Sequence, residues 1–85
     1  MTHIATITRR NRTLGVMWWD GEGCFAGTVR QCLATIPPDA DGIRWVVMIR
    51  GVCRGPLRVH GYANPTHGFE DLLSGADSIT VEWEE

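Results

Sequence analysis

Hydrophobic and polar residues alternate along three stretches of the chain, which is the pattern of a β-strand with one buried face. These stretches are residues 13–19 (TLGVMWW), 57–63 (LRVHGYA) and 78–85 (SITVEWEE). Residues 43–51 (IRWVVMIRG) form the most apolar run, which predicts a central strand. Residues 4–8 alternate more weakly and predict an additional strand near the N-terminus.

Two other segments carry apolar residues at helical spacing and are expected to form short helices. The first covers residues 29–36 and begins at a capping box, because Thr28 and Gln31 stand at the required spacing. A pair of prolines then prevents the helix from continuing. The second helix covers residues 66–74, and Gly75 provides its C-terminal stop.

The predicted order from residue 13 onward is β-α-β-β-α-β, the split βαβ arrangement of ferredoxin-like domains. The sequence therefore predicts an α+β fold: an antiparallel sheet with two short helices on one face and a possible extra N-terminal strand. Residues 43–51 and 57–63 are expected to pair as a hairpin. The whole chain, residues 1–85, is expected to form one small domain.

Strand parity divides the side chains between the two faces of this sheet. The helix-covered face is expected to hold Leu14, Val16, Trp18, Trp45, Val47, Ile49, Leu57, Val59, Ile79, Val81 and Trp83. The opposite, open face receives Met17, Trp19, Arg44, Val46, Met48, Arg50, Arg58, His60, Tyr62, Thr80, Glu82 and Glu84. The adjacent tryptophans are thereby separated: Trp18 is a core residue and Trp19 lies on the open face.

Charge is unevenly distributed along the chain, although the net charge is only -2. All eight arginines precede residue 61, whereas residues 61–85 carry six acidic residues and neither arginine nor lysine. No apolar run approaches the length of a membrane span, and the N-terminus lacks the pattern of a signal peptide. A cytoplasmic protein without a membrane partner is expected. The three cysteines have no framework spacing and are interpreted as reduced, mostly buried thiols.

The sequence contains no arrangement that indicates a metal, a cofactor or a catalytic group. Cys24, Cys32 and Cys53 form no CxxC pair, and the three histidines form no HxxxH pair. The glycines after residue 20 resemble a phosphate-binding loop only in part, because acidic residues flank them and the GxGxxG spacing is absent. We therefore expect no enzyme and no cofactor.

The open face combines aromatic residues, methionine and arginine, which are enriched at protein interfaces. The expected function is therefore a non-catalytic protein-binding domain, an inhibitor that blocks a host protein or complex. Its candidate contact residues are Trp19, Asp20, Glu22, Arg44, Met48, Arg50, Arg58, Tyr62, Glu82 and Glu84. Alternatively, a further strand, a loop or a second subunit covers this face, and a homodimer is possible.

Two other classes of function remain open. The first is a ferredoxin-like ligand-binding or small enzymatic domain. The second is an RNA-binding module that stacks bases on sheet aromatics. Nucleic acid is disfavoured because the isoelectric point is about 5.8 and Glu82 and Glu84 share the face.

In overall style the chain resembles the small inhibitors that phages and mobile elements encode, of which the anti-CRISPR proteins are the best-known group. The resemblance rests on a short α+β domain, an acidic C-terminal part and an excess of arginine over lysine. It implies a host protein or complex as the partner, and no binding residue is carried over from it.

Overall fold

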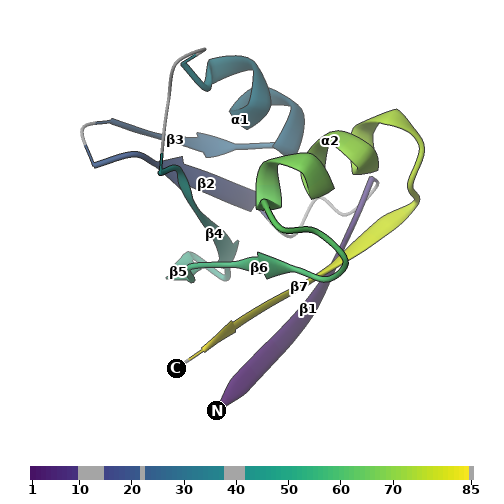
Figure 1. Cartoon of the computed structure of the whole chain (residues 1–85). Helices are drawn as coiled ribbons and strands as arrows, with labels where there is room; N and C mark the ends of the chain where they lie inside the picture. The colour runs from purple at the N-terminus through teal and green to yellow at the C-terminus, as the bar shows by residue number, and fades with distance from the viewer. Residues whose placement is uncertain (10–14, 22, 38–41, 85) are drawn as a thin grey trace.

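The computed structural model describes residues 1–9, 15–21, 23–37 and 42–84 of the 85-residue chain. Two helices and seven strands lie within these ranges (Figure 1). In chain order they are β1 (Thr2–Thr8), β2 (Gly15–Trp19), β3 (Cys24–Gly27), α1 (Val29–Thr35), β4 (Arg44–Ile49), β5 (Val52–Arg54), β6 (Arg58–Val59), α2 (Pro65–Ser74) and β7 (Ser78–Glu84).

The strands form two antiparallel sheets. The three-stranded sheet has the order β1-β7-β6, and the four-stranded sheet has the order β3-β2-β4-β5. The sheets meet between β5 and β6, where the backbone N–H of Leu57 donates to the carbonyl of Trp45 at 2.9 Å. One chain segment therefore pairs first with β4 and then with β7.

The small α+β class and the antiparallel pairing are confirmed, but the ferredoxin-like order is not, because seven strands form two sheets. The expected hairpin between residues 43–51 and 57–63 is replaced by two other pairings: β4 pairs with β5, and β6 pairs with β7. Arg50 and Gly51 make the tight β4–β5 turn with φ angles of 51° and 80°. Both residues thus adopt the positive φ that a two-residue hairpin of type I′ requires.

Both helices begin and end close to the predicted residues. Thr28 caps α1: its hydroxyl accepts from the backbone N–H of Gln31, and the Gln31 side chain accepts from the backbone N–H of Thr28. The side chain of Asn64 caps α2 in the same manner by accepting from the backbone N–H of Thr66. At the other end of α2, Gly75 is the C-cap, as expected.

The core lies between the helices and the sheets. The helices contact each other and lie on the same side of the strands, α1 over β2 and β3 and α2 over β6 and β7 (Figure 1). The parity prediction is confirmed for the described residues of the helix-covered face, of which only Ile49 is half-buried. Leu14 lies outside the described residues. The buried core consists of Ile7, Val16, Trp18, Cys32, Trp45, Val47, Leu57, Val59, Phe69, Leu72, Ile79, Val81 and Trp83.

Two buried tryptophans attach the helices to the four-stranded sheet. The indole N–H of Trp18 donates to the Thr35 hydroxyl at 2.9 Å, at the end of α1. The indole N–H of Trp45 donates to the Thr66 hydroxyl at 3.0 Å, in the first turn of α2. Trp45 also packs against Phe69, with 4.6 Å between ring centroids. Each indole thus buries its ring while its polar atom keeps a partner.

Candidate functional site

The four-stranded sheet has one face that the helices do not cover. Residues opposite one another in a ladder point to the same side, so the register defines this face. Trp19 pairs with Cys24 and Arg44, and Met17 pairs with Ala26 and Val46. We call this surface the tryptophan face. It consists of Met17, Trp19, Cys24, Ala26, Arg44, Val46, Met48 and Cys53.

Trp19 is the large exposed aromatic side chain of this face. Its exposed fraction is 43%, compared with 5% for the neighbouring Trp18, which confirms the predicted separation of the two. The guanidinium carbon of Arg44 lies 5.6 Å from the Trp19 ring centroid, within range of a cation–π contact. This contact positions both side chains on the surface, next to the half-buried Met17 and Val46.

The turn after Trp19 is stabilised by Asp20. A carboxylate oxygen of Asp20 accepts from the backbone N–H of Gly23 at 2.8 Å, and the Asp20 N–H donates to the Gly23 carbonyl at 3.2 Å. Asp20 therefore holds the β2–β3 turn in place beside the tryptophan face. Glu22, the other acidic residue predicted at this turn, lies outside the described residues.

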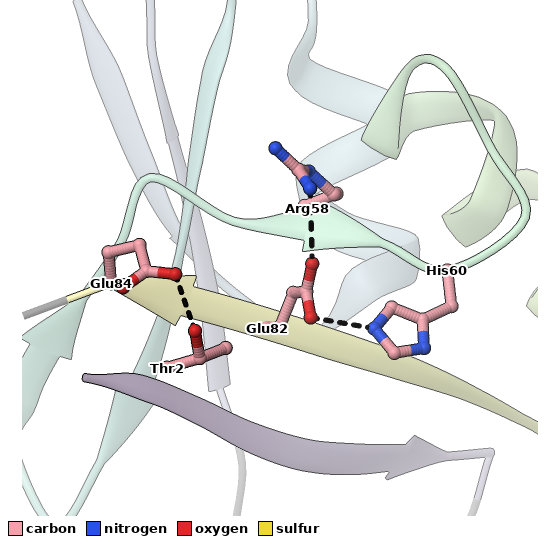
Figure 2. A network of polar contacts seen from close by, with 5 residues as sticks. All are labelled: Thr2, Arg58, His60, Glu82 and Glu84. Carbon is pink, nitrogen blue, oxygen red and sulfur yellow. Dashed lines mark hydrogen bonds and ion pairs between the residues drawn. The ribbon is translucent and has the colours of Figure 1, made fainter.

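The three-stranded sheet carries a different, polar surface on the outer sides of β6 and β7. Glu82 lies between Arg58 and His60, as Figure 2 shows. One Glu82 oxygen is 2.8 Å from His60 Nε2, and the other is 3.4 Å from Arg58 Nη1. The Thr2 hydroxyl donates to Glu84 at 2.5 Å. We call this surface the polar face, formed by Thr2, Ile4, Thr6, Arg58, His60, Thr80, Glu82 and Glu84.

The main acidic group of the polar face, Glu82, has its partners within the same chain. The hydrogen bond with His60 and the nearby positive charge of Arg58 hold the pKa of Glu82 below its ordinary value of 4.5. The carboxylate is therefore ionised at neutral pH, with partners from its own chain. Because its charge is already compensated, Glu82 has less to gain from an external cation than an unpaired carboxylate would have.

Two predicted contact residues lie elsewhere. Tyr62 was expected on the open face, but β6 ends at Val59 and Gly61 reverses the chain with a φ of 82°. The Tyr62 hydroxyl instead donates to Asp71 on α2, and this hydrogen bond raises the pKa of Tyr62. Arg50 was also placed on the open face by parity, yet it lies in the β4–β5 turn.

The structure thus divides the predicted contact residues into separate groups. Trp19, Arg44 and Met48 share the tryptophan face, with Asp20 at its end, whereas Arg58, Glu82 and Glu84 belong to the polar face. The sequence interpretation missed the contributions of β3 and β5 to the tryptophan face. Those strands are four and three residues long, so neither carries enough alternation to be recognised.

The cysteines also differ from expectation. Cys32 is fully buried, and its thiol donates to the carbonyl of Val16 at 3.3 Å. Burial raises the pKa of the Cys32 thiol to about 11, so it is protonated and unreactive at neutral pH. Cys24 and Cys53, expected to be mostly buried, are instead exposed on the tryptophan face as free thiols.

Two further kinds of site have no counterpart in the described part of the chain. It holds no group of three or more His, Cys, Asp or Glu side chains that could bind a metal ion. None of its helices is long and apolar enough to span a membrane.

In comparisons with known proteins, no family, no curated protein and no solved structure matches this chain. The fold and its two sheet faces therefore define it only as a small α+β domain with an exposed aromatic surface.

Proposed function

We propose that this chain is a non-catalytic protein-binding domain that contacts its partner through the tryptophan face. One observation carries the proposal: Trp19 is 43% exposed and stacked against Arg44. Tryptophan and arginine are the residue types most enriched among those that dominate binding energy at interfaces. The half-buried Met17, Val46 and Met48 continue the same face and add apolar contact area, which the two flexible methionines can adapt to a partner.

The geometry favours binding without a large ordering cost. Trp19 belongs to a strand paired on both sides, since β2 lies between β3 and β4. The Arg44 contact limits the freedom of both side chains before a partner arrives. Immobilising a flexible side chain costs about 0.5–1.5 kcal/mol on association, so a preorganised pair loses less of its binding energy.

The biological form that we propose is an inhibitor that occupies the surface of a host protein or complex in the cytoplasm. The resemblance in style to anti-CRISPR and related inhibitors supports this form, as does the exposed Trp19 on the tryptophan face. Such a protein acts by steric exclusion, so the area and chemistry of one face determine its effect.

A capture experiment with matched variants tests the proposal. Purified protein, Trp19→Ala and Ile4→Ala are immobilised, and each is incubated with lysate of the producing cell or its host. Ile4 is 63% exposed but lies on the polar face, so it controls for the loss of exposed apolar area. We expect a partner that the wild type and Ile4→Ala retain and Trp19→Ala loses, with a loss of about 2 kcal/mol in the affinity measured afterwards.

Two results would contradict the proposal. Equal capture by all three proteins would place the contact elsewhere on the molecule. A wild-type dimer in sedimentation that Trp19→Ala dissociates, with no captured partner, would make the tryptophan face a self-association surface instead.

A further inference from the structure

A concave feature lies at the end of the molecule where β1 ends and β2 begins. It is a groove of about 980 Å³ between the start of α1 and the end of α2. This volume falls within the range of small-molecule sites, roughly 300–1,000 Å³. The groove adjoins the tryptophan face, with which it shares Ala26 and Met48, but it contains neither Trp19 nor Arg44.

Three arginines from separate elements line this groove. Arg9 follows β1, Arg30 belongs to α1, and Arg50 lies in the β4–β5 turn. No aspartate or glutamate is among the described lining residues. None of the three arginines pairs with a carboxylate in the part of the chain that the structure describes. The described lining of the groove is therefore positively charged, in a protein whose net charge is negative.

Arg9 is fixed at this position by the fold. Its Nε–H donates to the carbonyls of Leu72 and Ala76, at 2.9 and 3.0 Å, where α2 ends. The backbone N–H of Arg9 also donates to the carbonyl of Asp77 at 3.3 Å. A guanidinium has five N–H donors, and these contacts use only one of them. The other donors have no partner among the described residues and are available to an anion.

The groove also has an apolar part. Its lining includes the buried Ile7 and Leu72 and the half-buried Val29, Met48 and Leu73. A hydrophilic anion alone would leave this surface unused, whereas an apolar ligand alone would desolvate arginines without replacing their hydrogen bonds. The complementary ligand carries both an anionic group and an apolar group.

We propose that this groove binds a small molecule in which a phosphate monoester adjoins an apolar part. Phosphate matches the charge and the planar donor geometry of arginine, which binds it through paired N–H···O bonds. The apolar part would cover Val29 and Leu73. This site is distinct from the protein-binding role of the tryptophan face, and neither depends on the other.

Octyl phosphate, below its micelle concentration, is a probe with both required groups. Isothermal titration of the full chain is expected to show saturable binding, tighter than that of inorganic phosphate or of octanol. The double variant Arg30→Gln, Arg50→Gln should bind at least about tenfold more weakly, because a hydrogen bond to a charged group contributes about 1.5–3 kcal/mol. Arg58→Gln is the control: it removes an exposed arginine on the polar face, outside the groove, and should leave the affinity unchanged.

Several results would overturn the proposal. These are a lack of saturable binding, equal affinity for octyl phosphate and octanol, or the same loss in Arg58→Gln as in the double variant. If the double variant fails to fold, the wild type decides: affinity that does not fall between about 50 and about 300 mM salt contradicts an arginine–phosphate contact. Trp19→Ala should bind octyl phosphate normally, so failure of the protein-binding proposal is distinguishable from failure of this one.

Discussion

The tryptophan face lies on the four-stranded sheet and the polar face on the three-stranded sheet, and the two faces differ in how their side chains are paired. On the polar face, Glu82 receives His60 and Arg58 as partners from its own chain. On the tryptophan face, Trp19 and Arg44 stack on each other and leave much of the indole exposed. One surface satisfies its polar groups internally, whereas the other presents an exposed aromatic ring with a cation stacked on it.

This difference shows that charge along the sequence is a poor guide to which groups lack partners on the folded surface. The acidic C-terminal part is prominent in the sequence, yet Glu82 is compensated on the folded surface. A surface ion pair of this kind contributes little to binding, because a new partner must first replace the contacts already present. A partly exposed indole has no such cost, since its burial releases water from apolar surface.

The largest expected effect is the difference in reactivity between the exposed and the buried cysteines. Cys24 and Cys53 lie on the tryptophan face, whereas Cys32 lies in the core. A thiol reagent should label two cysteines of the native protein quickly and the third only on unfolding. With a stability of at least about 5 kcal/mol, labelling of Cys32 through global unfolding should be at least about a thousandfold slower. Mass spectrometry over time measures this ratio, and protection of Cys24 or Cys53 would show that the face is covered.

The two adjacent tryptophans provide the next test. Trp18→Ala should reduce the free energy of unfolding by about 3–5 kcal/mol, because it leaves a cavity under α1 and removes a partner of Thr35. Trp19→Ala should cost less, about 1 kcal/mol, because its side chain is 43% exposed and the main loss is that of a good strand-forming residue. Urea denaturation of the two variants measures the difference. Equal losses would mean that Trp19 is a core residue and that the comparison of faces fails.

The junction between the sheets predicts a smaller effect. A Cβ added at Gly55 would lie 2.7 Å from Val46 Cγ1 and 2.9 Å from the Trp45 carbonyl oxygen, closer than atoms pack. Gly55→Ala should therefore destabilise the protein by about 1–3 kcal/mol through overpacking. Gly23→Ala is the matched control, because nothing lies within 4 Å of its added Cβ. Melting curves that rank the two variants in the reverse order would contradict the close approach of the chain to β4.

The smallest effect concerns the pH dependence of the polar face. The pKa of Glu82 is lowered in the folded state, so its contribution to stability is complete above its ordinary value of 4.5 and is lost as the pH falls below it. Glu82→Gln should melt slightly below the wild type at pH 7, and the gap should close in acid. Thr80→Val, a substitution on the same strand and face, should show a gap that does not vary over this range. A constant gap for Glu82→Gln would mean that its ionic contacts are not formed.

The features that could be predicted from the sequence are those with a clear period. Trp18, Val47 and Val81 were assigned to the core by alternation, and Thr28 and Gln31 located the start of α1. In both cases the local pattern and the tertiary burial agree, so no other information was needed. Trp19 and Arg44 were placed on one face for the same reason, and the register then made them neighbours.

The features that could not be predicted from the sequence depend on single backbone angles and on strand pairings of only two or three residues. The β4–β5 turn contains Arg50 at positive φ. Arginine rarely adopts this conformation, so its presence in the sequence does not indicate a turn. With that turn missed, the hairpin partner of β4 was assigned to residues 57–63. Tyr62 was placed on the wrong face because the alternation was counted through Gly61. The chain reverses at that residue, so strand parity no longer applies beyond it. The groove was not predicted at all, because Arg9, Arg30 and Arg50 are far apart in the sequence and line one groove only after folding.

The pairing of β1 with β7 has a consequence for how the chain folds. It joins the beginning of the domain to its end: Thr2 lies opposite Glu84, a separation of 82 residues. Such a contact requires closure of nearly the whole chain, whereas α1 and the β4–β5 hairpin form from residues close together. We therefore expect refolding on the millisecond-to-second scale typical of non-local topologies rather than the microseconds of helical bundles. Until the two ends meet, β7 is an unprotected edge, and aggregation competes with folding during this interval.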